Sequence, residues 1–149
     1  MRAMTAALAS ERAGAVSRDG LHAVTGTPRV WLRAEGVAAL VAGAALYLHL
    51  GGPLLWLVPL LFAVDVSMVG YLGGPRPGAL VYNLAHNWVA GLAVLALAWW
   101  LGSAPLALGG AILVAHTGLD RTLGYGLKYP TAFADTHLGR LGRPRGAGR

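Results

Sequence analysis

The chain has 149 residues, of which 56% are hydrophobic and 12% are charged, and its formal net charge is +6 at pH 7. A soluble globular domain has about 25% charged residues, so this composition excludes an ordinary soluble domain and is typical of a membrane protein. The absence of cysteine excludes disulfides and thiolate chemistry.

Positive charge is concentrated at the two ends of the chain. The residues that carry it are Arg2, Arg12, Arg18, Arg29 and Arg33 towards the N-terminus and Arg140, Arg143, Arg145 and Arg149 towards the C-terminus. Because the middle of the chain is apolar, we interpret these charges as topology signals and as contacts with anionic lipid headgroups. The expected partner is therefore the lipid bilayer, and no nucleic acid is expected.

Four apolar segments lie between the charged ends, at about 30–50, 53–72, 78–101 and 104–125. Each is close to the ~20 residues that a helix needs to cross ~30 Å of hydrocarbon. The turns between them are short and rich in glycine and proline, so consecutive helices are expected to run in opposite directions. The predicted fold class is an all-α membrane protein with four transmembrane helices in an antiparallel bundle.

The four-helix transmembrane domain is expected to cover residues 28–141. A flexible cytoplasmic tail is predicted over 1–27 and a basic C-terminal tail over 142–149. Neither tail contains an apolar face large enough to order it.

Two features of the apolar segments predict local geometry. Pro59 predicts a kink in the second helix, because a proline inside a helix removes one backbone hydrogen bond and clashes with the preceding turn. Small residues at 42–45 and 109–111 predict close packing between helices.

The distribution of charge between the loops predicts the orientation. The loop at 73–78 contains Arg76, whereas the turns at 51–53 and 102–104 carry no charge. By the positive-inside rule, both termini and the 73–78 loop are expected in the cytoplasm.

Ionisable residues interrupt the apolar segments at a common depth. At ~1.5 Å of rise per helical residue, Glu35, Asp65, His86 and His116 all lie roughly 9–14 Å from the cytoplasmic ends of their helices. Ionisable groups at this depth are unfavourable unless they face a bundle interior or a wet cavity. We therefore expect one polar pocket that faces the cytoplasm.

A divalent metal is the cofactor that these residues suggest. His116 and Asp120 are four residues apart on one helix, so both side chains can reach one ion. With His86 and Asp65 they form a set of two histidines and two carboxylates, which suits a divalent metal. The same four residues are the candidate catalytic groups, and the reserve ligands are Glu35 and His137. The alternative is a dry network in which imidazole N–H groups bond to the carboxylates.

Polar residues near the cytoplasmic ends of the third and fourth helices are the candidates for substrate binding. They are Asn83, Arg121, Lys128 and Tyr129. The basic members can capture the phosphate of an anionic lipid headgroup or another anion. The alternative interpretation is a positive-inside signal with side chains that extend towards the interface.

Six short motifs together resemble a known family. They are Arg33–Gly36, Asp65–Tyr71, Tyr82–His86, His116–Arg121, Gly124–Tyr129 and Asp135–Gly139. In combination they resemble the bacterial integral-membrane family catalogued as domain of unknown function 4260, over about residues 29–140. The resemblance implies a small four-helix, multi-pass protein of the bacterial inner (plasma) membrane, and it implies no particular activity.

The residues leave three classes of function open. The first is a metal-assisted membrane enzyme that acts on a lipid or another amphipathic substrate. The second is a non-catalytic module for membrane assembly or partner binding, in which the polar layer only specifies packing. The third is a proton or cation transporter subunit, although the outer half of the chain is uniformly apolar. The oligomeric state is also open.

Overall fold

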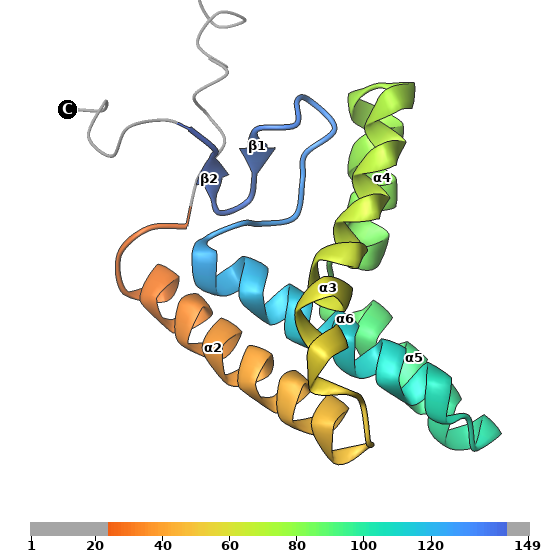
Figure 1. The fold of residues 1–149 in the computed structure, drawn as a ribbon. Coiled ribbons are helices and arrows are strands. Elements are labelled where there is room, and N and C mark those ends of the chain that lie inside the picture. The colour runs from red at the N-terminus through yellow and green to blue at the C-terminus, as the bar shows by residue number, and fades with distance from the viewer. Residues whose placement is uncertain (1–23, 143–149) are drawn as a thin grey trace, which may run out of the picture.

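The computed structural model describes residues 24–142, and these residues are mostly helical (Figure 1). The elements are α2 (Gly26–His49), α3 (Leu54–Ala63), the 3-10 helix η1 (Val64–Gly73), α4 (Pro75–Ala85), α5 (Trp88–Leu101), α6 (Ala104–Leu123), β1 (Asp135–Thr136) and β2 (Gly139–Arg140). The two strands pair in antiparallel fashion. The predicted tails over 1–27 and 142–149 lie outside the described residues, except for 24–27 and 142.

Two helical segments of the described chain are long and apolar enough to cross a membrane. They are α2, with 24 residues, and the continuous α3–η1 segment Leu54–Gly73, with 20 residues. A third results if α4 and α5, which are bent by 47° at a short break, are counted as one span. Large apolar side chains point outwards, as at Leu55 and Trp99, which are 81% and 88% exposed. An apolar exterior of this kind is consistent with a membrane protein.

The helices α2 and α6 lie side by side and run in opposite directions (Figure 1). Gly36 faces Gly118 and Thr122, whereas Gly43, two turns further along α2, faces Ala111 and Ala115. A Cβ on Gly43 would lie 2.6 Å from the backbone nitrogen of Ala115, so only glycine permits this approach. The predicted close packing of the small residues at 42–45 is confirmed at this contact.

The third predicted segment is not one continuous helix. It was expected over 78–101, but α4 ends at Ala85 and α5 begins at Trp88. Asn87 makes the break possible, because its side-chain oxygen accepts a hydrogen bond from the Ala90 N–H (2.9 Å) and its amide donates to the Asn83 carbonyl (2.6 Å). One side chain thereby satisfies backbone groups of both helices that the break leaves free.

The second predicted segment also departs from a regular α-helix. Pro59 lies inside α3, and the helix type changes five residues later, where the ten-residue 3-10 helix η1 begins at Val64. Runs of 3-10 helix longer than about four residues are uncommon, and inside a longer helix they often mark a functional hinge or strain. The second residue of η1 is Asp65.

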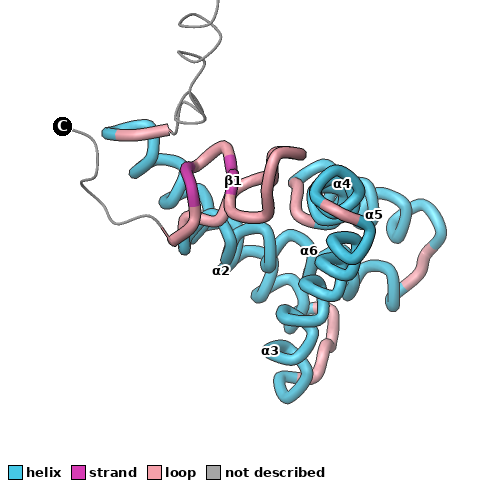
Figure 2. Tube along the Cα trace, turned by 90° about the horizontal axis from the view of Figure 1, so that it is seen from above, coloured by secondary structure: helices cyan, strands magenta, loops and turns pink. Residues whose placement is uncertain are grey.

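After α6, residues 124–142 fold back as a loop with the small β1–β2 sheet, which the sequence analysis did not predict. In Figures 1 and 2 this segment lies between the start of α2 and α4. Two hydrogen bonds join it to α4, since Asn83 donates to the Lys128 carbonyl (2.9 Å) and accepts from the Lys128 N–H (2.7 Å). The segment is thus fastened directly beside the polar residues of α4.

We expect Gly43→Ala to destabilise the protein. The added methyl group would meet the backbone of α6, which cannot move aside as a flexible side chain would. Overpacking of this kind typically costs about 1–3 kcal/mol. The measurement is thermal unfolding of the detergent-purified protein.

The matched control is Gly109→Ala on α6, where a Cβ would meet no atom within 4 Å. This change should be neutral, or stabilising by up to about 1 kcal/mol, because alanine favours the helix. Equal melting temperatures for the two variants would contradict the close contact between α2 and α6.

Candidate functional site

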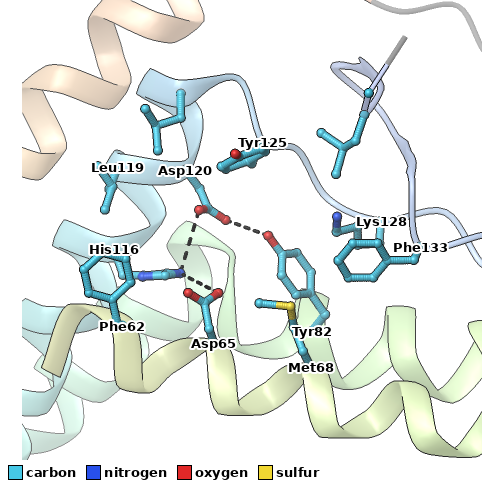
Figure 3. A pocket seen from close by; sticks show the side chains of 13 residues that line it. Phe62, Asp65, Met68, Tyr82, His116, Leu119, Asp120, Tyr125, Lys128 and Phe133 are labelled. Atoms are coloured by element: carbon cyan, nitrogen blue, oxygen red, sulfur yellow. Dashed lines mark hydrogen bonds and ion pairs between the residues drawn. The ribbon is translucent and has the colours of Figure 1, made fainter. Parts of the chain in front are cut away.

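The structure brings Asp65, His86, His116 and Asp120 together from η1, the α4–α5 break and α6. His86 Nε2 lies 3.4 Å from Asp65 Oδ1 and 4.0 Å from Asp120 Oδ2. His116 Nε2 lies 3.6 Å from Asp65 Oδ1 and 3.8 Å from Asp120 Oδ1. Figure 3 shows the His116 ring nitrogen directed between the two carboxylates. Each imidazole therefore meets both acids through its Nε2 atom.

The local backbone explains why His86 can reach this point. His86 is the residue that follows the last turn of α4, and its backbone angles (φ −107°, ψ 34°) are outside the helical range. Its Nδ1 atom lies 2.8 Å from the Tyr82 carbonyl oxygen. Because a carbonyl only accepts, Nδ1 carries the proton, and the lone pair of the neutral ring is on Nε2. This hydrogen bond leaves the Nε2 lone pair directed at the carboxylates, where it can bind a metal ion shared with them.

Tyr82 orders the site in two further ways. Its ring is stacked on the His86 ring, with centroids 3.7 Å apart and planes 14° apart. Its hydroxyl donates a hydrogen bond of 2.6 Å to Asp120 Oδ2 (Figure 3). The sequence analysis did not assign Tyr82 to the site, although its position four residues before His86 was a usable signal.

His116 lacks the hydrogen bonds that a buried imidazole normally makes. It is 2% exposed, and neither ring nitrogen has a hydrogen-bond partner among the described residues. The two carboxylates lie beyond hydrogen-bond distance from its Nε2 atom, at 3.6 and 3.8 Å. Buried polar atoms without protein partners are uncommon in native proteins, and a site for a bound water or ion is one explanation for them.

The spacing of the donor atoms fits a shared metal ion. One donor atom each from Asp65, His86 and His116 lies within 4.8 Å of the other two. Ligand atoms bound at about 2.0–2.2 Å from one metal are about 3.4 Å apart in tetrahedral geometry, which is close to the distances from Asp65 to the two histidines. Asp120 is not a member of this group of three, and its Oδ2 atom is held by Tyr82.

A cavity of about 420 Å³ opens beside these residues. Its polar wall is formed by Asp65, Tyr82, His116, Asp120, Tyr125 and Lys128, and its apolar wall by Phe62, Met68, Leu119, Leu123, Phe133 and Leu141. Asp65 faces this space, since its side chain is 30% exposed, whereas the side chains of His86 and His116 are 0% and 2% exposed. A ligand in the cavity can therefore reach the acids directly.

The four residues predicted to bind substrate occupy different places. Lys128 lines the cavity, whereas Asn83, Arg121 and Tyr129 are not part of its wall. The Arg121 guanidinium donates to the carbonyl oxygens of Tyr125 (2.8 Å) and His86 (3.3 Å). Asn83 holds the backbone of Lys128 through two hydrogen bonds. The geometry thus gives Arg121 and Asn83 positioning tasks, and only Lys128 is placed to meet a ligand.

The reserve ligands do not join the cluster. Glu35 is exposed on α2. His137 lies in the β1–β2 turn, and its Nδ1 atom accepts a hydrogen bond of 2.8 Å from the Leu127 N–H. Glu35 was expected at the same depth as the other acids, but depth alone does not fix which way a side chain points. The α2 helix consequently contributes no carboxylate to the site.

Two ionisable side chains of the 124–142 segment have shifted pKa values. Burial lowers the pKa of Lys128, and the negative charges of Asp120 and Asp65 partly oppose this effect. Burial also lowers the pKa of His137, and the positive charge of Arg121 adds to the shift. The neutral form of His137 is therefore favoured in the folded protein.

We expect the 124–142 segment to loosen as the pH falls below 6.5, the ordinary pKa of histidine, towards the lower pKa that His137 has in the folded protein. The folded pKa of His137 is lowered, so its stabilising effect is complete above 6.5 and is lost at lower pH, when Nδ1 gains a proton and cannot accept from Leu127. The measurement is hydrogen-exchange protection of the Leu127 amide between about pH 8 and about pH 5, corrected for the intrinsic rate.

The control is His137→Gln, whose carbonyl oxygen can accept the same hydrogen bond without titrating. Protection in this variant should vary less with pH than in the parent protein. Equal pH dependence in the two proteins would contradict a role for His137.

Comparisons with known proteins identify the family but no activity. The model of one family, described as a domain of unknown function (DUF4260), matches residues 29–141. No curated protein and no solved structure gives a significant match to the chain. The matched segment covers most of the chain and contains the cluster formed by Asp65, His86, His116 and Asp120. The protein therefore belongs to the DUF4260 family.

Proposed function

We propose that this protein is a multi-pass enzyme of the bacterial inner membrane that uses a divalent metal ion, held in a cytoplasm-facing pocket, to hydrolyse an amphipathic substrate. The observation that carries the proposal is the convergence of donor atoms from Asp65, His86 and His116 within 4.8 Å of one another beside a cavity. The membrane arrangement and the chemistry have separate support.

Four spans with both termini in the cytoplasm agree with the direction of the helices. The α2–α6, α5–α6 and η1–α4 pairs are all in close contact. Gly110 on α6 packs against Leu95, whereas Val114 packs against Gly91, so α5 and α6 also run in opposite directions. The only short loop with a charge is the one at Arg76, between the second and third spans. Uncharged turns on the outer side and arginines on the inner side satisfy the positive-inside rule.

The donor set limits the choice of metal. Two imidazoles and one carboxylate suit zinc, iron or manganese, and a site with three protein ligands keeps positions open for water and substrate. The hydrogen bond from His86 Nδ1 to the Tyr82 carbonyl fixes the ring in the orientation needed for binding through Nε2. His116, without a partner on either nitrogen, gains one if Nε2 binds the ion.

The remaining residues fit a hydrolytic reaction. A divalent metal in such a site lowers the pKa of bound water and polarises an ester or phosphoryl oxygen. Asp120 lies next to this position and can accept a proton from the attacking water through Oδ1, because Oδ2 is occupied by the Tyr82 hydroxyl. Arg121 keeps His86 in place by donating to its carbonyl oxygen.

We expect the purified protein to contain about one zinc, iron or manganese ion per chain. Asp65→Asn, His86→Ala and His116→Ala should each lower the metal affinity by at least about tenfold, because each removes a ligand. The measurement is elemental analysis after exchange into metal-free buffer, followed by titration with each metal and a thermal unfolding scan. Bound metal should raise the melting temperature of the parent protein.

The matched controls are His49→Ala and Glu35→Gln, which remove an exposed histidine and an exposed carboxylate of α2. Both should keep the metal content of the parent protein. The contrary outcome is that the parent protein binds no metal and that His116→Ala merely lowers the melting temperature relative to the parent. This result would identify the cluster as a packing network.

Reporter fusions test the membrane arrangement. A reporter inserted at residue 52 should report the periplasmic side, and a reporter at the C-terminus should report the cytoplasm, because the turn at 51–53 lacks charge and the C-terminal end is basic. Both reporters on the same side of the membrane would contradict the four-span topology.

A further inference from the structure

We infer that the substrate is an amphiphile with a single negative charge, whose anionic group binds between the metal site and Lys128 while its apolar chain leaves the cavity towards the lipid. The inference rests on the proposed metal site. It is argued from the surroundings of Lys128, the balance of buried charges and the rim of the cavity.

Lys128 is a buried cation without an anionic partner. Its side chain is 5% exposed and lines the cavity. Within residues 24–142, no carboxylate oxygen lies within 4.0 Å of Nζ. The amino group is instead held over aromatic rings, at 4.1 Å from the Phe133 centroid and 5.1 Å from the Tyr82 centroid. Cation–π contacts position an ammonium group but leave its charge available to an anion.

The sequence gives Lys128 a special place among the basic residues. The chain has twelve lysines and arginines in total, and Lys128 is the only lysine. Two hydrogen bonds from Asn83 fix its backbone. Figure 3 shows its amino group across the Tyr82 ring from His116, and all three side chains line the same cavity.

The buried charges set the charge of the ligand. The two carboxylates of Asp65 and Asp120 line the cavity, and their charges are balanced by Lys128, which also lines it, and by Arg121, which is buried outside its wall. A divalent metal would leave an excess of two positive charges. If Asp120 passes the proton of the metal-bound water on to solvent before the substrate binds, the hydroxide left on the metal would neutralise one of these charges, and a monoanionic substrate would neutralise the other. A neutral substrate would leave a buried charge uncompensated, and a dianion would reverse the excess.

The rim of the cavity indicates that the ligand is an amphiphile. Phe62, Leu123 and Phe133 line the cavity and are 60%, 54% and 47% exposed. Phe62 and Leu123 lie on α3 and α6, so the opening joins the apolar outer surface of two helices. Contiguous exposed apolar side chains mark surfaces that contact lipid or an apolar part of a ligand. The apolar rim favours a headgroup inside the cavity and acyl chains along the helices.

Native mass spectrometry of the detergent-purified, metal-loaded protein tests the inference, because it counts bound metal and bound lipid on the same molecule. The probes are dioleoylphosphatidylglycerol, which has one negative charge, and dioleoylphosphatidylcholine, which has the same phosphodiester but no net charge. Phosphatidylglycerol should be retained at least about tenfold more strongly, and Lys128→Met should remove this preference while metal content is unchanged. Chelation of the metal should also weaken retention.

Three controls separate the alternatives. Lys128→Arg keeps the charge and should retain part of the preference, and Arg76→Met removes an exposed cation outside the cavity and should change nothing. Glycerophosphoglycerol, the same anionic headgroup without acyl chains, should bind at least about tenfold more weakly than the lipid. Equal binding of this soluble headgroup would overturn the assignment to an amphiphile.

The outcomes for the two hypotheses are distinguishable in the same spectra. One outcome is that about one metal ion is bound per chain but Lys128→Met does not alter the lipid preference. This result would overturn the role of Lys128 and leave the metal site intact. Absence of metal would overturn the proposed function, and with it the charge balance from which the monoanion is inferred. Lipid retention that does not depend on metal would overturn the inference in the same way.

Discussion

The constraint on which the rest of the structure depends is the placement of two carboxylates among apolar helices. Asp120 is 6% exposed, and Asp65, whose side chain is 30% exposed, lines the cavity. A carboxylate removed from water is strongly unfavourable unless it is hydrogen-bonded, paired with a cation or bound to a metal. The polar groups near these acids come from α4, the α4–α5 break and α6. The arrangement of these three helical segments therefore depends on the polar partners that the two carboxylates require.

The backbone is irregular at the places where the carboxylates meet their polar partners. His86 lies at the break between α4 and α5, and Asp65 lies at the start of the 3-10 helix η1. At membrane depth, non-helical backbone is tolerated where it is buried in protein or lines a cavity, since lipid offers no hydrogen bonds. Asn87 supplies those bonds at the break. Both irregularities adjoin the same polar cluster, as expected if helix geometry was adapted to the site.

Much of the site could be predicted from the sequence because the relevant signals are local. Spacing along one helix joins His116 to Asp120, and the predicted depth in the membrane relates this pair to His86 and Asp65. The side of the helix on which a residue lies is set by packing, so the same reasoning wrongly included Glu35, which is exposed. The break at His86 and the change of helix type at Val64 also escaped prediction, because a continuous apolar segment gives no sign of either.

The segment after α6 was the least predictable part of the site. Its two contacts with Asn83 join residues 45 positions apart, and no periodic pattern reports such a contact. From the sequence, a group of basic residues was expected near the cytoplasmic ends of the helices, but their separate roles could not be distinguished. The structure distinguishes the roles of Arg121 and Lys128. The planar guanidinium of arginine has several donors and suits fixed backbone acceptors, whereas the compact ammonium group of lysine suits a movable anion.

Arg121 and Lys128 illustrate this difference and what it means for the site. The Arg121 guanidinium donates hydrogen bonds to the carbonyl oxygens of His86 and Tyr125. It thereby fixes both the helix break and the start of the loop. Its charge helps to neutralise Asp120 without reaching the cavity. Lys128 lines the cavity, and its amino group lies over the rings of Phe133 and Tyr82. A purely structural polar layer would need the first arrangement but not the second, because an unpaired buried cation lowers stability unless a ligand compensates it. The position of Lys128 on the cavity wall therefore supports the proposed ligand-binding role of the pocket.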